Sequence, residues 1–338
     1  MRLSKPAGGL LGLGMVALAG VSAVKVAGTR IRNHHDPALD ALAAADVALV
    51  HHRIATADGG ELHVVEAGTP EGRPVVLLHG VTLQWWVWSA LLPLLADRYR
   101  VVAWDMRGHG ESRAGSDGVS LEATADDLAT LLRELDLQDA VLVGHSMGGM
   151  TLGHFARRHP DELAARVAGL YFVATSGFAI DRSLSAGNLR TAYGLVGRAL
   201  VSGLRRPSPR YPWPDNDLSA VLLRTAFGPS ATGQMVDAVR RMSADMATAT
   251  MIEAGNALAA QDVRQVLPFV DVPTEVVVGD RDRITPPGHA RLIAELVPGA
   301  RLTELPGIGH QIMQEAPAEL AAGIDRLDGL AGALVPVA

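Results

Sequence analysis

The stretch Val141–Met150 reads VLVGHSMGGM and contains the pattern Gly-x-Ser-x-Gly. Its first residues are apolar, which is typical of a buried strand, and a helix-compatible sequence follows the second glycine. A serine between such a strand and such a helix must adopt a strained backbone conformation that exposes its hydroxyl above the sheet. Gly144 and Gly148 have no side chain, so the helix can approach the strand closely. The stretch therefore predicts Ser146 as a nucleophile.

Composition places the chain among globular proteins and narrows the classes of partner. Its 338 residues are 48% hydrophobic and 20% charged, enough for one large α/β domain with an insertion or for two smaller domains. Residues 1–32 carry five basic side chains and no acid, so a net charge of −6 becomes −11 for the remainder. A body this acidic predicts no nucleic-acid partner. The lack of cysteine excludes disulfides, thiolate catalysis and zinc–thiolate sites.

Residues 1–32 have the pattern of an export or anchoring segment. An uncharged run of 17 residues, 8–24, lies between basic flanks. A charged start before a short apolar run is typical of a signal peptide, and Val21-Ser22-Ala23 resembles a cleavage site. The same run is just long enough for a retained membrane anchor. We therefore expect a membrane-anchored or secreted protein, with a helix docked on a cytoplasmic protein as the alternative, and interpret residues 33–50 as a linker.

Apolar runs alternating with helical patterns predict an α/β core in two parts, residues 51–176 and 266–338. Residues 53–56 and 61–66 are typical of a β-hairpin. We expect further strands at 74–78, 101–104, 141–144, 167–174, 274–278 and 301–305, and helices at 86–97, 121–135, from the elbow to 159, 287–297 and from about 316. Strands separated by helices of this length imply right-handed crossovers and a mostly parallel, doubly wound sheet.

Residues 177–265 interrupt this alternation and contain no convincing strand, so we interpret them as an α-helical cap. Four prolines between 205 and 217 predict an irregular loop. A later helical pattern places Met235, Met242 and Met246 on one face. Two interpretations are open for these methionines: they dock the insertion on the core, or they form an adaptable apolar lining for a substrate pocket.

Candidate partners of Ser146 lie on loops after the last two predicted strands. A serine nucleophile needs a base, usually an imidazole, and a carboxylate that orients the base. The loop that begins at Gly279 carries Asp280 and Asp282, and His310 follows the next strand. In an open α/β sheet these loops emerge at the same edge. We therefore expect Ser146, His310 and one of the two aspartates to converge.

The chain from about His51 to Leu330 resembles the α/β-hydrolase fold superfamily, in its single-serine esterase and lipase branch with a helical cap. The motifs that carry the resemblance are His79-Gly80 followed by Trp88, DMRGHGES at 105–112, GHSMGG at the elbow, GDRDRITPP from 279 and GIGHQIMQEAP from 307. The resemblance implies Ser146 as nucleophile, His310 as base and Asp282 as the orienting acid, with Asp280 as the fallback.

An oxyanion hole needs two backbone donors. The elbow places the amide of Met147 at a helix N-terminus beside the nucleophile. The resemblance implies the amide of Val81 as the second donor. The tryptophans nearby suggest one further contact, and we interpret Trp85 as a candidate substrate contact. We expect the histidines of the family motifs, His79, His109 and His145, to hold loops together by hydrogen bonds.

These features predict a serine hydrolase that cleaves carboxylic esters through an acyl-enzyme intermediate, without a metal or organic cofactor. A small hydrophobic ester is the expected substrate because the cap is apolar. Other chemistries of the same triad remain open: perhydrolysis of the cofactor-free haloperoxidase type, carbon–carbon bond hydrolysis and acyl transfer. A non-catalytic receptor for a small ligand is the alternative from another class. The sequence does not predict the oligomeric state.

Overall fold

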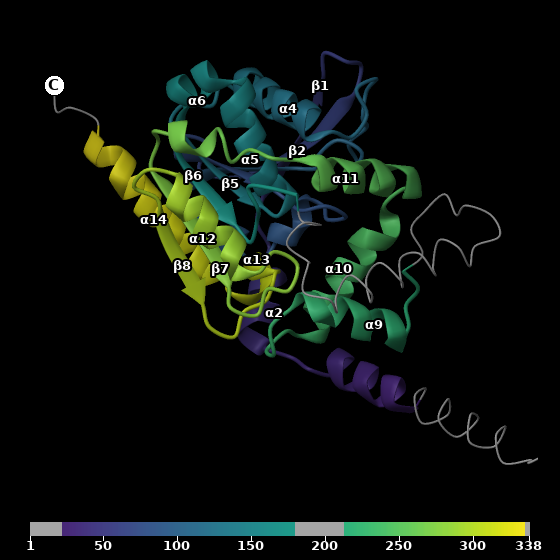
Figure 1. Ribbon diagram of the computed structural model, residues 1–338. Coiled ribbons are helices and arrows are strands. Elements are labelled where there is room, and N and C mark those ends of the chain that lie inside the picture. Colours follow the sequence, from purple (N-terminus) through teal and green to yellow (C-terminus); the bar gives the residue numbers. More distant parts are fainter. Residues whose placement is uncertain (1–21, 180–212, 335–338) are drawn as a thin grey trace, which may run out of the picture.

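The computed structural model describes residues 22–179 and 213–334 (Figure 1). An eight-stranded sheet forms the centre, in the order β1-β2-β4-β3-β5-β6-β7-β8. The pairs β1–β2 and β2–β4 are antiparallel and the other five pairs are parallel, so the predicted hairpin and the mostly parallel sheet are confirmed. The strands are β1 Leu49–Ala55, β2 Glu61–Gly68, β3 Arg73–Leu78, β4 Tyr99–Trp104, β5 Ala140–His145, β6 Val167–Val173, β7 Thr274–Gly279 and β8 Arg301–Leu305.

Helices cover both faces of the sheet, as expected for a doubly wound fold (Figure 1). The α-helices are α2 Pro37–Ala43, α3 Leu92–Leu95, α4 Leu121–Glu134, α5 Met147–Arg158, α6 Pro160–Arg166, α9 Asp217–Leu223, α10 Gly233–Asp245, α11 Thr248–Ala260, α12 Pro287–Leu296, α13 Ile312–Glu315 and α14 Pro317–Leu334. The short 3-10 helices are η1 Trp85–Trp88, η2 Arg224–Ala226 and η3 Leu267–Phe269. A further helix covers residues 22–32.

Successive side chains of the central strands point to opposite faces of the sheet, which divides the core into two apolar layers. Val76 and Leu78 of β3 pack with α4, α5 and α12, whereas Val75 and Leu77 pack with α3, α10 and α14. All four side chains have no exposed surface. A strand buried on both faces has no polar positions, which explains why continuous apolar runs predicted these strands correctly.

One helical prediction needs correction, and one helix was not predicted. The helix expected over residues 86–97 is instead η1 followed by the one-turn α3, because Pro93 has no N–H to continue the helical ladder. Pro160 ends α5 as expected, but it also occupies the first position of α6, an extra helix before β6. A proline is tolerated there, since a first-turn N–H has no helical partner.

The insertion contains α9, α10 and α11, and its described residues form no strand beyond an isolated bridge between Phe178 and Asp262. This bridge and a bond from Val263 N–H to the Gly177 carbonyl (2.9 Å) join the two ends of the insertion. Most of the proline-rich loop predicted at 205–217 lies outside the described residues.

The segment interpreted as a linker is packed against the insertion. The Gly233 N–H at the start of α10 donates to the His34 carbonyl (2.8 Å), and Arg32 pairs with Asp217 (2.5 Å). The strand β1 begins at Leu49, two residues before the expected start of the core. In the described ranges, which leave out most of the apolar run 8–24, no helix is both long and apolar enough to span a bilayer.

Candidate active site

Ser146 occupies the predicted turn between β5 and α5. Its backbone lies at φ 52° and ψ −113°, a strained conformation for a residue with a side chain. The Ser146 N–H donates to the Val173 carbonyl (3.0 Å), and its carbonyl accepts from the Thr175 hydroxyl (2.6 Å). A Cβ on Gly148 would lie 2.3 Å from the Leu78 carbonyl oxygen, so only glycine fits there. The surroundings therefore fix the turn that presents the Ser146 side chain.

His310 and Asp282 form the hydrogen-bonded pair that the sequence predicts. The distance from His310 Nδ1 to Asp282 Oδ2 is 2.8 Å, and both residues are buried. The other lone pairs of Asp282 accept from the amides of Ile284 (2.8 Å) and Thr285 (2.9 Å) and from the Thr285 hydroxyl (2.8 Å). With Asp282 acting as acceptor, Nδ1 carries the proton and Nε2 presents a lone pair.

Asp280, the alternative acid, holds the turn. Its carboxylate accepts from the Gly307 N–H (2.7 Å) and lies 3.6 Å from Arg281. These contacts join the ends of β7 and β8, from which the loops of Asp282 and His310 emerge. Asp280 therefore serves the geometry of the loops, whereas Asp282 contacts the imidazole.

The loop of His310 lies directly beside the elbow. The Nε2–H of His145, the residue before Ser146, donates to the His310 carbonyl (3.0 Å), and the two rings are 4.7 Å apart. Burial lowers the pKa of His145 well below its ordinary value, so His145 is a neutral donor that cannot repel a protonated His310. This hydrogen bond brings together segments 165 residues apart.

The loop after β3 supplies the second predicted donor. A Cβ on Gly80 would lie 3.1 Å from Ser146 Cβ, so the Gly80–Val81 backbone passes directly over the elbow. Among the described residues, the amides of Val81 and Met147 donate to no protein acceptor. Two free amides from different segments next to one serine are the elements of an oxyanion hole.

Helix α10 of the insertion holds this loop in place. Thr82 has a strained φ of 66°, and its hydroxyl accepts from Ser243 (3.0 Å). The Gln84 N–H donates to the sulfur of Met242 (3.3 Å), and the Gln84 side chain donates to Asp245 (3.1 Å). The position of the Val81 amide is therefore coupled to the insertion.

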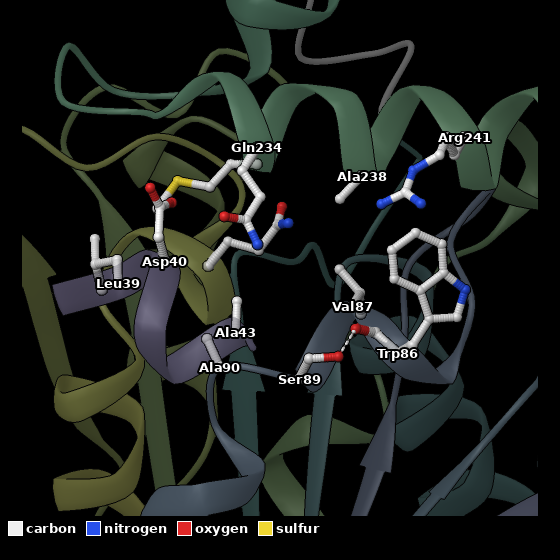
Figure 2. Close-up of a pocket in the computed structure, with 12 residues that line it drawn as sticks. Leu39, Asp40, Ala43, Trp86, Val87, Ser89, Ala90, Gln234, Ala238 and Arg241 are labelled. Carbon is white, nitrogen blue, oxygen red and sulfur yellow. Dashed lines mark hydrogen bonds between the residues drawn. The ribbon is translucent and has the colours of Figure 1, made fainter. Parts of the chain in front are cut away.

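The other proposed substrate contacts lie in different environments. Met242 is buried against the loop after Val81, and Met246 packs in the core layer of α4 and α5. Met235 lines a cavity of about 130 Å³ between α2, α10 and η1, in which Trp86 faces Arg241 at 5.2 Å (Figure 2). The Trp85 ring packs edge-on against His51, with centroids 6.2 Å apart. Contact of these residues with a substrate stays a prediction.

Buried polar groups behind the site act as braces. The Met106 N–H donates to His79 Nε2 (2.9 Å), and burial lowers the pKa of His79 to about 3. Arg107 bonds Asp127 (2.7 Å) and Asp58 (3.0 Å). The first contact connects the loops after β3 and β4, and the two ion pairs connect the loop after β4 to α4 and to the turn between β1 and β2. Burial leaves His79 neutral. The described residues contain no group of three or more metal-ligating side chains.

Glu315 is a functional candidate that sequence reasoning missed. Its carboxylate accepts from the Gly309 N–H (3.1 Å), directly before His310, and from the Gly228 N–H (2.6 Å) of the insertion. The His310 N–H in turn donates to the Ala226 carbonyl (2.8 Å). Burial raises the pKa of Glu315 to about 7. The sequence showed a charged residue in a mostly apolar stretch after His310. It did not show that this residue contacts Gly228 of the insertion.

Comparisons with known proteins agree on one family. A profile described as alpha/beta hydrolase fold matches residues 73–317. A non-heme chloroperoxidase of Kitasatospora aureofaciens is 33% identical over 267 residues, which cover 76% of this chain and 91% of the relative. A pimeloyl-acyl-carrier-protein methyl ester esterase of Chromobacterium violaceum is 30% identical over 241 residues, which cover 71% of this chain and 88% of the relative.

A solved structure extends the agreement to three dimensions. A thermophilic esterase from Thermogutta terrifontis is similar with a TM-score of 0.68 and 28% identity, covering 83% of this chain and 99% of that one. The profile matches well over half of the chain, and the relatives are matched over most of their own length. The chain belongs to the α/β-hydrolase fold family and is a hydrolase.

Proposed function

We propose that the protein cleaves carboxylic esters with Ser146 as nucleophile, His310 as base and Asp282 as orienting acid. The observation that carries this proposal is the buried His310–Asp282 pair. The His310 carbonyl accepts a hydrogen bond from His145, the residue before the strained serine. Nε2 of His310 takes the serine proton as Ser146 Oγ attacks the ester carbonyl. Asp282 stabilises the imidazolium that forms.

Catalysis then proceeds in two steps. The amides of Val81 and Met147 hold the oxyanion of the tetrahedral intermediate, and loss of one such donor typically costs about 10²–10³-fold in rate. The imidazolium returns its proton to the alcohol, which leaves, and an acyl group remains on Ser146. Water deprotonated by His310 then attacks the acyl-enzyme and releases the carboxylic acid.

The relatives support ester chemistry and also favour a second candidate. One relative is named as a methyl ester esterase, and a solved structure is described as an esterase. Another relative is named as a non-heme chloroperoxidase. The second candidate is therefore perhydrolysis, in which hydrogen peroxide replaces water in the attack on the acyl-enzyme and gives a peracid. Both reactions need the same acyl-enzyme, and small hydrophobic acyl groups suit the apolar insertion.

Hydrolysis of p-nitrophenyl esters of rising chain length tests the proposal. Wild type should show saturable turnover with a preference for acyl length, and Ser146→Ala should lose at least about 10³-fold in kcat. Ser116→Ala is the matched control, because Ser116 is exposed on a remote loop. Full activity of Ser146→Ala contradicts the proposal. Halogenation of monochlorodimedone with peroxide, bromide and acetate identifies perhydrolysis, provided that Ser146→Ala abolishes it.

A further inference from the structure

Three arginines line a cavity where the insertion meets the loop of Asp282. The cavity has a volume of about 450 Å³ and is bounded by Arg224, Thr225, Phe227, Pro229, Arg281 and Arg283. Arg224 begins η2, at the end of α9, and Arg281 and Arg283 flank Asp282 in sequence. The side chain of Asp282 is buried against His310, whereas both neighbouring arginines are exposed. Two chain segments therefore bring positive charge to one cavity.

The positive charge of this cavity is poorly balanced by protein carboxylates. Arg224 donates to the Phe227 carbonyl (3.2 Å), and Arg281 lies 3.6 Å from Asp280. Arg283 has no ion pair with any described residue. Burial lowers the pKa of the Arg224 guanidinium, and repulsion by Arg283 acts in the same direction. The half-buried Arg224 is therefore in a costly environment that an anion would relieve.

Arg107 shows how a buried arginine with a structural role is paired in this protein. Arg107 is buried and bonds two carboxylates, those of Asp127 and Asp58. Arg224 is half-buried, and its one hydrogen-bond partner among the described residues is the Phe227 carbonyl. Glu315 raises the pKa of Arg224, but burial raises the pKa of Glu315 itself to about 7, so its compensating charge is incomplete near neutral pH. Among the described residues, Arg224 therefore has room for an anionic partner.

We propose that this cavity binds the carboxylate or phosphate group of a small organic anion. Guanidinium groups are planar donors that match the oxygens of both groups. Phe227 and Pro229 provide an apolar wall beside the charges. A volume of about 450 Å³ is in the usual range for small-molecule sites and exceeds what an inorganic ion needs. The ligand therefore combines an oxyanion with an apolar portion.

The site is mechanically connected to the candidate active site. Ala226, between the lining residues Thr225 and Phe227, accepts from the His310 N–H (2.8 Å). The oxyanion belongs either to the ester substrate itself or to a separate anion that stabilises the contact between insertion and core. The first assignment rests on the proposed function. Anion binding itself does not depend on it.

Anion binding is tested first on the catalytically silent variant Ser146→Ala. Isothermal titration with hexanoate and with hexyl phosphate, at constant ionic strength, should give one saturable site, and hexanol should give none. Arg283→Gln should weaken binding at least tenfold, and Arg224→Gln should act likewise. Arg291→Gln, which removes an exposed arginine of α12 that pairs with Glu304 of β8, is the matched control and should leave affinity unchanged. Arg283 is exposed, so its replacement leaves the fold intact if Arg224→Gln fails to fold.

Kinetics on the active enzyme then distinguish the two sources of the anion. If the oxyanion belongs to the substrate, Arg283→Gln raises KM for mono-p-nitrophenyl glutarate at least tenfold and leaves p-nitrophenyl butyrate unaffected. If it is a separate ligand, hexanoate raises the melting temperature of wild type but not of Arg283→Gln. In that case Arg283→Gln changes the KM of both esters by the same factor. The anion site is overturned if Ser146→Ala shows no saturable binding, or if adding Arg283→Gln to Ser146→Ala leaves the affinity unchanged. Either result leaves the proposal of ester hydrolysis intact.

Discussion

Replacement of Glu315 by glutamine should remove a pH-dependent loss of stability. Burial raises the pKa of Glu315 from an ordinary 4.5 to about 7, and the hydrogen bonds from Gly228 and Gly309 offset only part of that effect. At pH 4.5 and below, the carboxyl group is largely protonated in the folded protein. As the pH rises toward 7, the unfolded chain ionises first, so unfolding becomes more favourable. Above pH 7 the folded form ionises too, and the loss levels off.

The size of this effect follows from the two pKa values. The interval between 4.5 and about 7 corresponds to at most about 3 kcal/mol of unfolding free energy. Glutamine at position 315 keeps one acceptor for the two glycine amides but cannot ionise. The stability of wild type minus that of Glu315→Gln should therefore fall by about 2–3 kcal/mol between pH 4.5 and pH 8.

Urea unfolding followed by circular dichroism at several pH values measures this difference. The neutral buried histidines, His79 and His145 among them, impose the opposite slope because they protonate on unfolding, but they do so in both proteins and cancel in the difference. Glu71→Gln, which removes an exposed carboxyl in the turn between β2 and β3, provides a matched control that should show no such fall. A difference between wild type and Glu315→Gln that stays constant across this range refutes the reasoning.

Four further substitutions test the scaffold and the assignment of the acid. Arg107→Ala should lower the unfolding free energy by about 3–5 kcal/mol in urea titrations, because it leaves two buried carboxylates without their cation; an effect below 1 kcal/mol would contradict a bracing role. Asp282→Asn should lower kcat on p-nitrophenyl butyrate by up to about 10⁴-fold. Asp280→Asn should retain most of the activity, and the reverse order would reassign the acid. Gly148→Ala should prevent soluble expression or sharply lower the melting temperature, because its Cβ would lie 2.3 Å from the Leu78 carbonyl; a normal melting curve would contradict the packing.

The turn at Ser146 could be predicted from the local sequence, because the residues that must be glycine lie within two positions of the serine. Gly144 is required by contact between β5 and α5, and Gly148 by contact between α5 and Leu78 of β3; a Gly-x-Ser-x-Gly pattern after an apolar run indicates both positions. The central strands were predictable for a related reason: a strand covered on both faces contains only apolar residues. The choice of Asp282 over Asp280 came from family resemblance, and the structure places Asp282 on the imidazole.

Contacts between distant segments were not predictable. Glu315 joins Gly228 of the insertion to Gly309, and a Cβ on Gly228 would lie 2.0 Å from the Gly307 carbonyl oxygen. Gly228 belongs to no recognisable local pattern, and the motif GIGHQIMQEAP does not indicate which segment its glycines contact, so only the folded structure reveals that these backbones touch. The segment treated as a linker likewise docks on α10 through His34, a contact across about 200 residues.

The most direct test of the central claim is the site of covalent modification by an active-site probe. Native protein is treated with a fluorophosphonate, digested and mapped by mass spectrometry, with heat-denatured protein as the control. The account predicts a single stoichiometric adduct on Ser146, lost on denaturation and strongly slowed in His310→Ala, because His310 supplies the base that activates the serine. An unlabelled Ser146, or a label on another residue of the native protein, would contradict the account.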